Sequence, residues 1–381
     1  MAEIEGRYEE QFKPVADALS RNLDSGADVG ASVAVFIDGE PVVDIWGGYS
    51  DTDQTRRWER DTLVNVFSTT KTMTFLCALM LADRGELDFD APVARYWPEF
   101  AAAGKNRVLV RHLLGHTAGL SGWEQPLVPE DLGDWEKCTE LLAAQEPWWE
   151  PGTASGYHAV TQGYLIGEVV RRITGSTIGT FFRQEVAEPV DADFLIGMPA
   201  SEDGRVLPLI PPSAEETQKH LALLGELGVR TLINPPVAGE TSAEEWWRRA
   251  EIPAAGGHGN ARSVAAVQSV IACGGEVRGK RLLSEAGVRA LFAEQSNGTD
   301  LVLGVPLRYG LGYGLSSETL PMGPNMCAWG GYGGSIVFND LDTRTTFAYV
   351  MNRMEAGLVG DERGASIGIA VAQSMMASQR L

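Results

Sequence analysis

The chain has 381 residues, of which 44% are hydrophobic and 22% charged, a composition typical of a soluble globular protein with a large core. Its formal net charge of -20 at pH 7 would repel nucleic acid and anionic membrane surfaces, so we expect neither as a partner. The N-terminal segment is acidic, and no run approaches the roughly 20 apolar residues that cross a bilayer, so we expect a cytoplasmic protein.

The first ninety residues alternate between helical and strand patterns. Apolar residues at helical spacing predict an amphipathic helix over residues 8–23. Two β-rich runs joined by Asp38 and Gly39 predict a hairpin. A short apolar run at 63–67 then leads into a helix that is apolar on nearly every face and that Gly85 can terminate.

Residues 90–250 are rich in helical patterns, prolines and tryptophans, and few strands are evident among them. Helices are expected at about 263–273 and 284–295. Three or four short β-rich runs with glycine turns follow, and a last helical pattern over 363–379 closes the chain.

This order of elements predicts an α+β fold with two lobes. If the early hairpin and the late strands share one antiparallel sheet, residues 1–90 and 251–381 form one discontinuous lobe. Residues 91–250 then form a second, mainly helical lobe. We expect the functional site in the cleft between the two lobes.

Metal and cofactor sites are not indicated by the sequence. His112 and His116 lie four positions apart without the His-Glu-x-x-His pattern of a zinc site, so they are interpreted as structural. No Gly-x-Gly-x-x-Gly run or phosphate loop is present, and we expect no cofactor. Buried thiols, with no disulfide and no zinc, are expected for the four cysteines: Cys77, Cys138, Cys273 and Cys327.

The stretch NVFSTTKTMTF places Ser68 and Lys71 three positions apart where the strand-like run gives way to the helix. Positions three apart share one helix face about 5 to 6 Å apart, so the lysine amine can reach the serine oxygen. A serine hydroxyl needs a base to become a nucleophile, and burial lowers the pKa of a lysine until its amine can act as one. The first N–H groups of the helix would stabilise the resulting oxyanion.

The alternative is that Ser68 or Thr69 caps the helix and that Lys71 is a surface residue. Lys71 is, however, the only charged residue between Asp61 and Asp83, and a lone charge in an apolar stretch favours a functional role. The chain has no Gly-x-Ser-x-Gly sequence, so the nucleophile turn of α/β-hydrolases is not indicated.

Five segments, in this order, resemble the serine β-lactamase and penicillin-binding protein superfamily. The first is Ser68-Thr69-Thr70-Lys71. The others are VRHLLGHTAGL (110–120), EPGTASGYHAVTQGYLIGEVVRRITG (150–175), PAAGGHGNARSVAAVQSVIACGGEVRGKRLLS (253–284) and AWGGYGGSIVFNDLDTRTTFAYVMNRM (328–354). The resemblance extends from about residue 30 to 375, with 200–245 poorly matched, and is closest to the β-lactamase-like carboxylesterases called family VIII.

The resemblance implies a β-lactamase/D,D-peptidase-like fold, in which helices flank an antiparallel sheet beside a mostly helical lobe. It implies that Ser68 is acylated and that Lys71 and Tyr157 share the proton transfers, with either able to be the resting base. It places the oxyanion between the backbone N–H groups of Ser68 and Tyr332.

Trp329, Gly330 and Gly331 stand where this superfamily usually carries Lys-Thr-Gly or His-x-Gly. A lysine there supplies positive charge for a substrate carboxylate, whereas tryptophan offers an apolar wall and one N–H donor. We therefore expect this segment to contact a neutral substrate, with core packing as the alternative for Trp329. His158 departs from the small or polar residue expected beside Tyr157 and is a further candidate substrate contact.

These residues predict a serine hydrolase that cleaves small to medium carboxylic esters through an acyl-enzyme. An acyltransferase of the same superfamily shares the first half-reaction and stays open. A β-lactamase or D-amino-acid peptidase is disfavoured by the missing positive charge. A catalytically silent binding protein is the alternative from another class, and retention of Ser68, Lys71 and Tyr157 disfavours it. The expected partner is a small ester, and a homodimer is left open.

Overall fold

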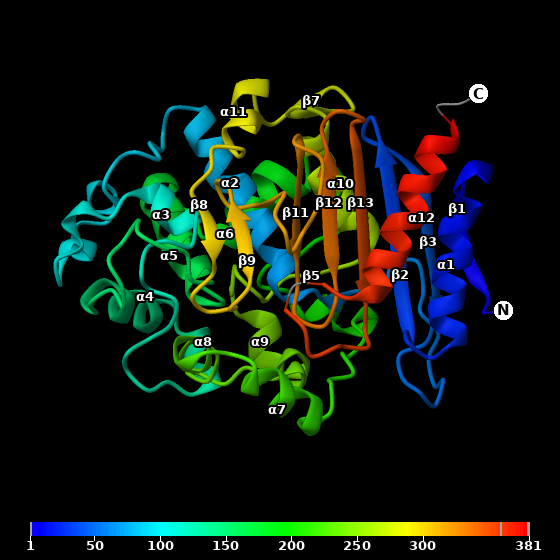
Figure 1. The fold of residues 1–381 in the computed structure, drawn as a ribbon, viewed down its shortest axis with the longest axis horizontal. Helices are drawn as coiled ribbons and strands as arrows, with labels where there is room; N and C mark the ends of the chain where they lie inside the picture. Colours follow the sequence, from blue (N-terminus) through cyan, green and yellow to red (C-terminus); the bar gives the residue numbers. More distant parts are fainter. Residues whose placement is uncertain (1, 359, 379–381) are drawn as a thin grey trace.

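The computed structural model describes residues 2–358 and 360–378 (Figure 1). In this part of the chain a nine-stranded sheet has the order β1-β3-β2-β13-β12-β11-β10-β9-β8, with all neighbours antiparallel. Its strands are β1 (Ile4–Tyr8), β2 (Gly30–Ile37), β3 (Glu40–Gly48), β8 (Ser296–Thr299), β9 (Pro306–Tyr309), β10 (Gly314–Leu315), β11 (Met326–Gly330), β12 (Ile336–Asp340) and β13 (Thr345–Met351). Two short pairs accompany it: β4 (Val64–Asn65) with β5 (His258–Gly259), and β6 (Glu276–Val277) with β7 (Lys280–Arg281).

The helices gather around this sheet and to one side of it. They are α1 (Lys13–Asp24), α2 (Lys71–Asp83), α3 (Val110–Leu114), α4 (Trp135–Ala144), α5 (Thr161–Thr174), α6 (Ile178–Phe182), α7 (Ala214–Ala222), α8 (Glu226–Leu232), α9 (Glu245–Arg249), α10 (Ala261–Ala272), α11 (Glu285–Ala290) and α12 (Glu362–Ser378). Helices α3, α4 and α5 lie on the opposite side of the molecule from β1 and α1 (Figure 1). The lobe boundaries near residues 90 and 250 stay a prediction.

The two ends of the chain meet in the sheet, which confirms that the early hairpin and the late strands share it. Asp38 and Gly39 have positive φ angles of 52° and 80°, as the tight turn of a two-residue hairpin requires. Strand β13 pairs with β2 from Thr345 opposite Ile37 to Met351 opposite Ala31. The expected α+β arrangement is therefore present.

Helices cover both faces of the central strands. Helix α10 packs across β2, β12 and β13, while α1 and α12 pack against each other and against β3 and β13. Strand β13 is buried along its whole length, and β2 is buried except at its last residue. Strands covered on both faces have nearly continuous apolar sequences, which explains the run GASVAVFI in β2.

The N-terminal segment differs from the prediction. Residues 4–8 form the edge strand β1, paired with β3, and the helix begins at Lys13 rather than at residue 8. Four of the five residues of β1 are exposed, so the strand carries no alternation of apolar and polar side chains that would reveal it. Pro14 lies in the first turn of α1, a position that favours a helix start.

The C-terminal part holds more strands than the three or four expected, because β8 was not predicted and the expected run LRYGLGYGL contains two strands, β9 and β10. Strand β8 has the polar sequence SNGT, and β10 has only two residues, so neither gives a clear sequence signal. Helix α11 is shorter than the expected 284–295. The last helix is described over Glu362–Ser378, and residue 379 of the prediction lies outside the described residues.

Helix α2 runs through the centre of the molecule. Its residues 71–81 are buried on every face, and Gly85 follows the helix with a φ of 75°, both as predicted. The strand-like run before it is reduced to β4, which pairs with β5 from the distant segment at residue 258. This pairing joins the start of α2 to the segment that precedes α10.

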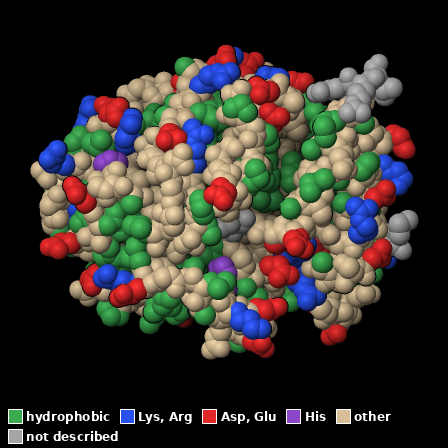
Figure 2. Space-filling view, in the orientation of Figure 1, with side chains coloured by type: hydrophobic (Ala, Val, Ile, Leu, Met, Phe, Trp, Pro, Cys, Tyr) green, Lys and Arg blue, Asp and Glu red, His purple; other side chains and the backbone are tan. Residues whose placement is uncertain are grey.

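The charged side chains are dispersed over the surface that Figure 2 shows. Acidic and basic side chains are interspersed over the face shown in Figure 2, without one continuous charged patch. The four cysteines are buried free thiols. None of the helices within residues 2–358 and 360–378 combines the length and apolarity that a membrane-spanning helix needs.

Candidate active site

Ser68 lies in a strained turn at the entry to α2. It is the second residue of a 3₁₀ helix, η2 (Phe67–Thr70), which continues directly into α2. Phe67 has a φ of 42°, in a region that bulky side chains rarely occupy. The side chain of Asn65 holds the turn: its oxygen accepts the N–H of Phe67 at 3.1 Å, and its amide donates to two carbonyls that lead into β5 at 3.0 and 3.2 Å. The surrounding structure thus maintains the strained backbone of Phe67, the residue before Ser68.

Lys71 lies one helical turn beyond Ser68 and is only 1% exposed. Its amine is bonded to the carbonyl oxygens of Ala159 at 2.6 Å and Ala254 at 3.0 Å, and it lies 3.0 Å from the Oγ of Ser68. No carboxylate in the described part of the chain forms an ion pair with it. Burial therefore lowers the pKa of Lys71 well below its usual 10.5.

Tyr157 approaches Ser68 from the segment between α4 and α5. Its hydroxyl donates to the Oγ of Ser68 at 2.7 Å, and its ring centre lies 4.9 Å from the amine of Lys71. Burial raises the pKa of Tyr157 above its usual value, and the hydrogen bond with Ser68 opposes that shift only in part. Tyr157 is therefore a protonated phenol at neutral pH.

The hydrogen bonds around Ser68 show which atom can accept its hydroxyl proton when Lys71 is neutral. A neutral amine has two N–H bonds and one lone pair, and the carbonyls of Ala159 and Ala254 accept both N–H bonds of Lys71. The third position of the amine, 3.0 Å from the Oγ of Ser68, is a donor when the amine is charged and the lone pair when it is neutral. The same Oγ accepts a hydrogen bond from Tyr157. Within the described residues the amine is the acceptor left for the hydroxyl hydrogen of Ser68. The arrangement can therefore transfer a proton from Ser68 to Lys71.

The turn after β11 packs directly on residues 66–69, the turn that carries Ser68; we call residues 66–69 the nucleophile turn. The hydroxyl of Ser335 donates to the carbonyl of Val66 at 3.0 Å and lies 2.9 Å from the Oγ1 of Thr69. The N–H of Gly331 donates to the carbonyl of Ser335 at 2.8 Å. A Cβ at Gly331 would lie 2.2 Å from the oxygen of Val66, so only glycine permits this approach.

This contact brings the two expected oxyanion donors to one cavity. Ser68 and Tyr332 line the same cavity, and the N–H of Tyr332 has no acceptor among residues 2–358 and 360–378. Ser68 is at the start of a helix, where backbone N–H groups have no partner within the helix. Both N–H groups are therefore free to bind a substrate oxygen.

The cavity beside Ser68 has a volume of about 440 Å³ and a mainly apolar lining without lysine or arginine in the described residues. One wall is formed by the nucleophile turn and by Ser121, Trp123 and Val160. The other is formed by residues from the segment 211–240, among them Leu221. In the sequence, residues 200–245 were the part that matched the superfamily motifs poorly.

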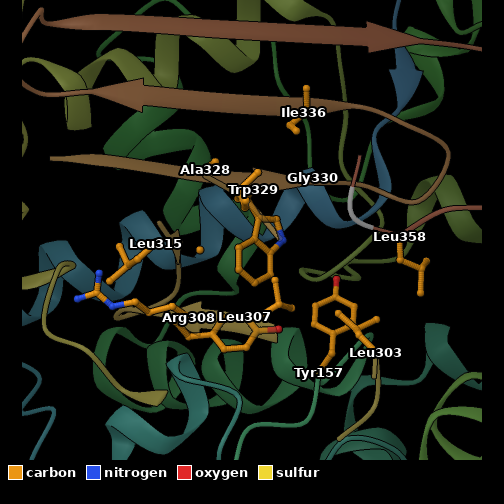
Figure 3. Close-up of a pocket in the computed structure, with 13 residues that line it drawn as sticks. Tyr157, Leu303, Leu307, Arg308, Leu315, Ala328, Trp329, Gly330, Ile336 and Leu358 are labelled. Carbon is orange, nitrogen blue, oxygen red and sulfur yellow. The ribbon is translucent and has the colours of Figure 1, made fainter. Parts of the chain in front are cut away.

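A second, smaller cavity of about 50 Å³ is lined by Tyr157, which also lines the larger one (Figure 3). Trp329 and Gly330 line this cavity and not the larger one, whereas Gly331 lines neither. The indole N–H of Trp329 is buried and has no hydrogen-bond partner among the described residues. The remaining lining is mostly aliphatic: Leu303, Leu307, Leu315, Leu320, Ala328, Ile336 and Leu358.

His158 lies next to Tyr157 in the sequence but points away from both cavities. It is fully buried, its Nδ1 bonds the carbonyl of Gly156 at 2.6 Å, and its Nε2 accepts the N–H of Leu120 at 3.0 Å. Burial lowers the pKa of His158 to about 3, so it is neutral. His158, a candidate substrate contact, therefore lines neither cavity, and its ring instead bonds the backbone of Gly156 and Leu120.

His116 is closer to the chemistry than its sequence context indicated. Its ring stacks on that of Trp329, with centres 5.4 Å apart and an interplanar angle of 8°. It also lies 5.1 Å from the ring of Tyr157, and its Nδ1 accepts the N–H of His158 at 3.0 Å. His116 thus packs against two residues that line the smaller cavity, and only its place in the segment VRHLLGHTAGL could have indicated this.

We predict that Gly331→Ala lowers kcat for a test ester such as p-nitrophenyl butyrate by about 100-fold. The added methyl would displace the turn at residues 331–335, called here the oxyanion turn, from the carbonyl of Val66. Gly298→Ala is the matched control, since a Cβ there meets nothing within 4 Å. Steady-state kinetics and circular dichroism of both variants test this. A folded Gly331→Ala protein with the kcat of the control would contradict the proposed role of the turn.

Comparisons with known proteins agree with this geometry. The sequence model of the Beta-lactamase family matches residues 15–371. The esterase/beta-lactamase LipL of Mycobacterium tuberculosis is 37% identical over 376 residues, which cover 96% of this chain and 86% of that protein. A family VIII carboxylesterase structure is 40% identical and superposes with a TM-score of 0.91, covering 98% of this chain and all of the other.

A penicillin-binding protein homologue from Caulobacter crescentus is 37% identical and superposes with the same TM-score of 0.91, over 98% of this chain and 100% of that one. These matches confirm the expected β-lactamase/D,D-peptidase-like fold and the similarity to family VIII carboxylesterases. The family match extends over nearly the whole described chain. The chain therefore belongs to the Beta-lactamase family.

Proposed function

We propose that this protein is a carboxylic ester hydrolase that forms an acyl-enzyme on Ser68, with Lys71 as the resting base and Tyr157 as the proton donor. This proposal rests on the buried amine of Lys71. Two backbone carbonyls hold this amine, and its nitrogen lies 3.0 Å from the Oγ of Ser68. The esterase names of the two relatives that cover most of the chain support the choice of esters.

Acylation begins when Ser68 attacks the carbonyl carbon of the ester and its hydroxyl proton passes to Lys71. The oxygen that becomes negative is bound by the N–H groups of Ser68 and Tyr332. When the carbon–oxygen bond to the alcohol breaks, Tyr157 gives its proton to the leaving alkoxide. The ammonium of Lys71 then returns a proton to Tyr157, so the alcohol leaves neutral.

Deacylation uses the same groups in the reverse order. Lys71 and Tyr157 together remove a proton from a water molecule, whose oxygen attacks the acyl carbon. The bond to Ser68 breaks, its Oγ recovers a proton from the same pair, and the carboxylic acid leaves. No residue other than these three changes its protonation state in the cycle.

The cavities support neutral esters as substrates. The 440 Å³ cavity has Ser68 in its wall and no lysine or arginine in its described lining, so a substrate carboxylate would find no counter-ion there. Trp329 brings an aromatic ring to the smaller cavity where a lysine would bring positive charge. The one arginine in the described lining of this cavity, Arg308, is paired with Glu294 at 2.6 Å. Small to medium acyl groups fit the larger cavity.

The first prediction of the proposed function is that the protein hydrolyses p-nitrophenyl butyrate and that a fluorophosphonate labels Ser68, as located by mass mapping. Ser68→Ala should lose turnover and labelling while remaining folded, because a small residue near a helix start costs at most about 2 kcal/mol. Turnover by Ser68→Ala close to that of the unaltered protein would rule out the assignment. Nitrocefin serves as the β-lactam comparison, with slower turnover expected.

The second prediction concerns pH. Because burial places the pKa of Lys71 below 10.5, kcat/KM should fall as the pH is lowered through that pKa and the amine takes up a proton. Lys71→Arg should be inactive between about pH 6 and pH 10, because a guanidinium stays protonated throughout that range. A pH–rate profile of both proteins tests this, and an active Lys71→Arg variant would exclude Lys71 as the base.

A further inference from the structure

The segment that carries Tyr157 belongs to no helix or strand, so its position depends on individual hydrogen bonds. Its three consecutive N–H groups are all held by distant residues. The N–H of Gly156 donates to the carbonyl of His116 at 2.9 Å, and that of His158 donates to the Nδ1 of the same histidine at 3.0 Å. Between them, the N–H of Tyr157 donates to a carboxylate oxygen of Asp300 at 3.0 Å.

Asp300 is fully buried and follows β8 directly. Its Oδ1 accepts three backbone N–H groups, from Tyr157 at 3.0 Å and from Val302 and Leu303 at 2.9 Å each. Its Oδ2 accepts the hydroxyl of Tyr309 at 3.1 Å. One side chain thus ties the loop between β8 and β9 to the backbone of the proposed proton donor.

The surroundings of Asp300 are unusual for a buried acid. No lysine, arginine or histidine forms an ion pair with it in the described part of the chain, and only neutral donors contact it. Glu168, by contrast, is buried beside Arg171 and Arg172. A buried acid without a cation is costly, and the four neutral donors that surround this one fix the position of its oxygen atoms.

The loop between β8 and β9 also reaches the smaller cavity. The N–H of Leu301 donates to the carbonyl of Ser155 at 2.8 Å, a second tie to the tyrosine segment. Leu303 lines the cavity, and the ring of Tyr309 lies 5.9 Å from that of Trp329. A displacement of Asp300 would therefore move the tyrosine segment and this cavity wall together.

We propose that Asp300 is a positioning residue for Tyr157: by accepting its backbone N–H, it sets the height of the phenol above the Oγ of Ser68. The inference rests on the proposed ester hydrolysis and deepens it. The phenol contacts Ser68 at 2.7 Å, and a displacement of about 1 Å at such a contact lowers a rate by about 100-fold. Geometry, and not the negative charge, is the property that matters in this role.

Three variants separate geometry from charge. Asp300→Asn keeps an oxygen in the same place, so its kcat for p-nitrophenyl butyrate should stay within about 3-fold of the unaltered protein. Asp300→Glu keeps the charge but moves the oxygens by one methylene, and Asp300→Ala removes them. Both should lower kcat by about 10- to 100-fold, with a smaller change in KM and equally slowed labelling of Ser68 by a fluorophosphonate.

Glu168→Asp is the matched control, because it moves a different buried carboxylate by one methylene, and we expect a lower Tm with an unchanged kcat. If Asp300→Ala fails to fold, comparison of kcat between Asp300→Glu and Asp300→Asn still separates the effect of oxygen position from that of charge. Wild-type kcat in folded Asp300→Glu, or a kcat in Asp300→Asn as low as in Asp300→Glu, would overturn the positioning role alone. Absence of turnover and of Ser68 labelling in the unaltered protein would overturn the proposed function as well.

Discussion

The proposed chemistry depends on the placement of one buried lysine amine, which has no carboxylate partner among the described residues. Three segments converge on it: Lys71 from α2, the carbonyl of Ala159 from the tyrosine segment and the carbonyl of Ala254 from the stretch before β5. Because both carbonyls are main-chain groups, they direct the amine without adding negative charge that would keep it protonated. The turn at Asn65 and the β4–β5 pair place Ser68 at the remaining position.

The same construction separates the chemistry from substrate choice. The groups to which we assign the proton transfers lie on α2 and on a segment held by His116 and Asp300, apart from the cavity wall contributed by residues 211–240. The large wall contributed by residues 211–240 can change without moving Ser68, Lys71 or the oxyanion turn. This division agrees with a family whose relatives carry both esterase and β-lactamase names.

Local patterns in the sequence were sufficient for the hairpin at Asp38, for the buried helix α2 and for the spacing of Ser68 and Lys71 on one turn. The position of Tyr157 came only from resemblance, since nothing in its own segment encodes a helix or a strand. Asp300 was not predicted, because it acts 143 positions away from the N–H that it accepts, and no periodic pattern reports such a contact. Strand β1 was missed because it is exposed and polar.

The most direct test of this account is an NMR titration of the lysine side chains, with carbon-13 at Cε. The chain has only six lysines, and the signal of Lys71 is identified by its loss in Lys71→Arg. The account predicts that this amine is neutral at the pH of ester turnover, with a pKa well below 10.5. Titration of Lys71 near 10.4, the value of an exposed lysine, would contradict it.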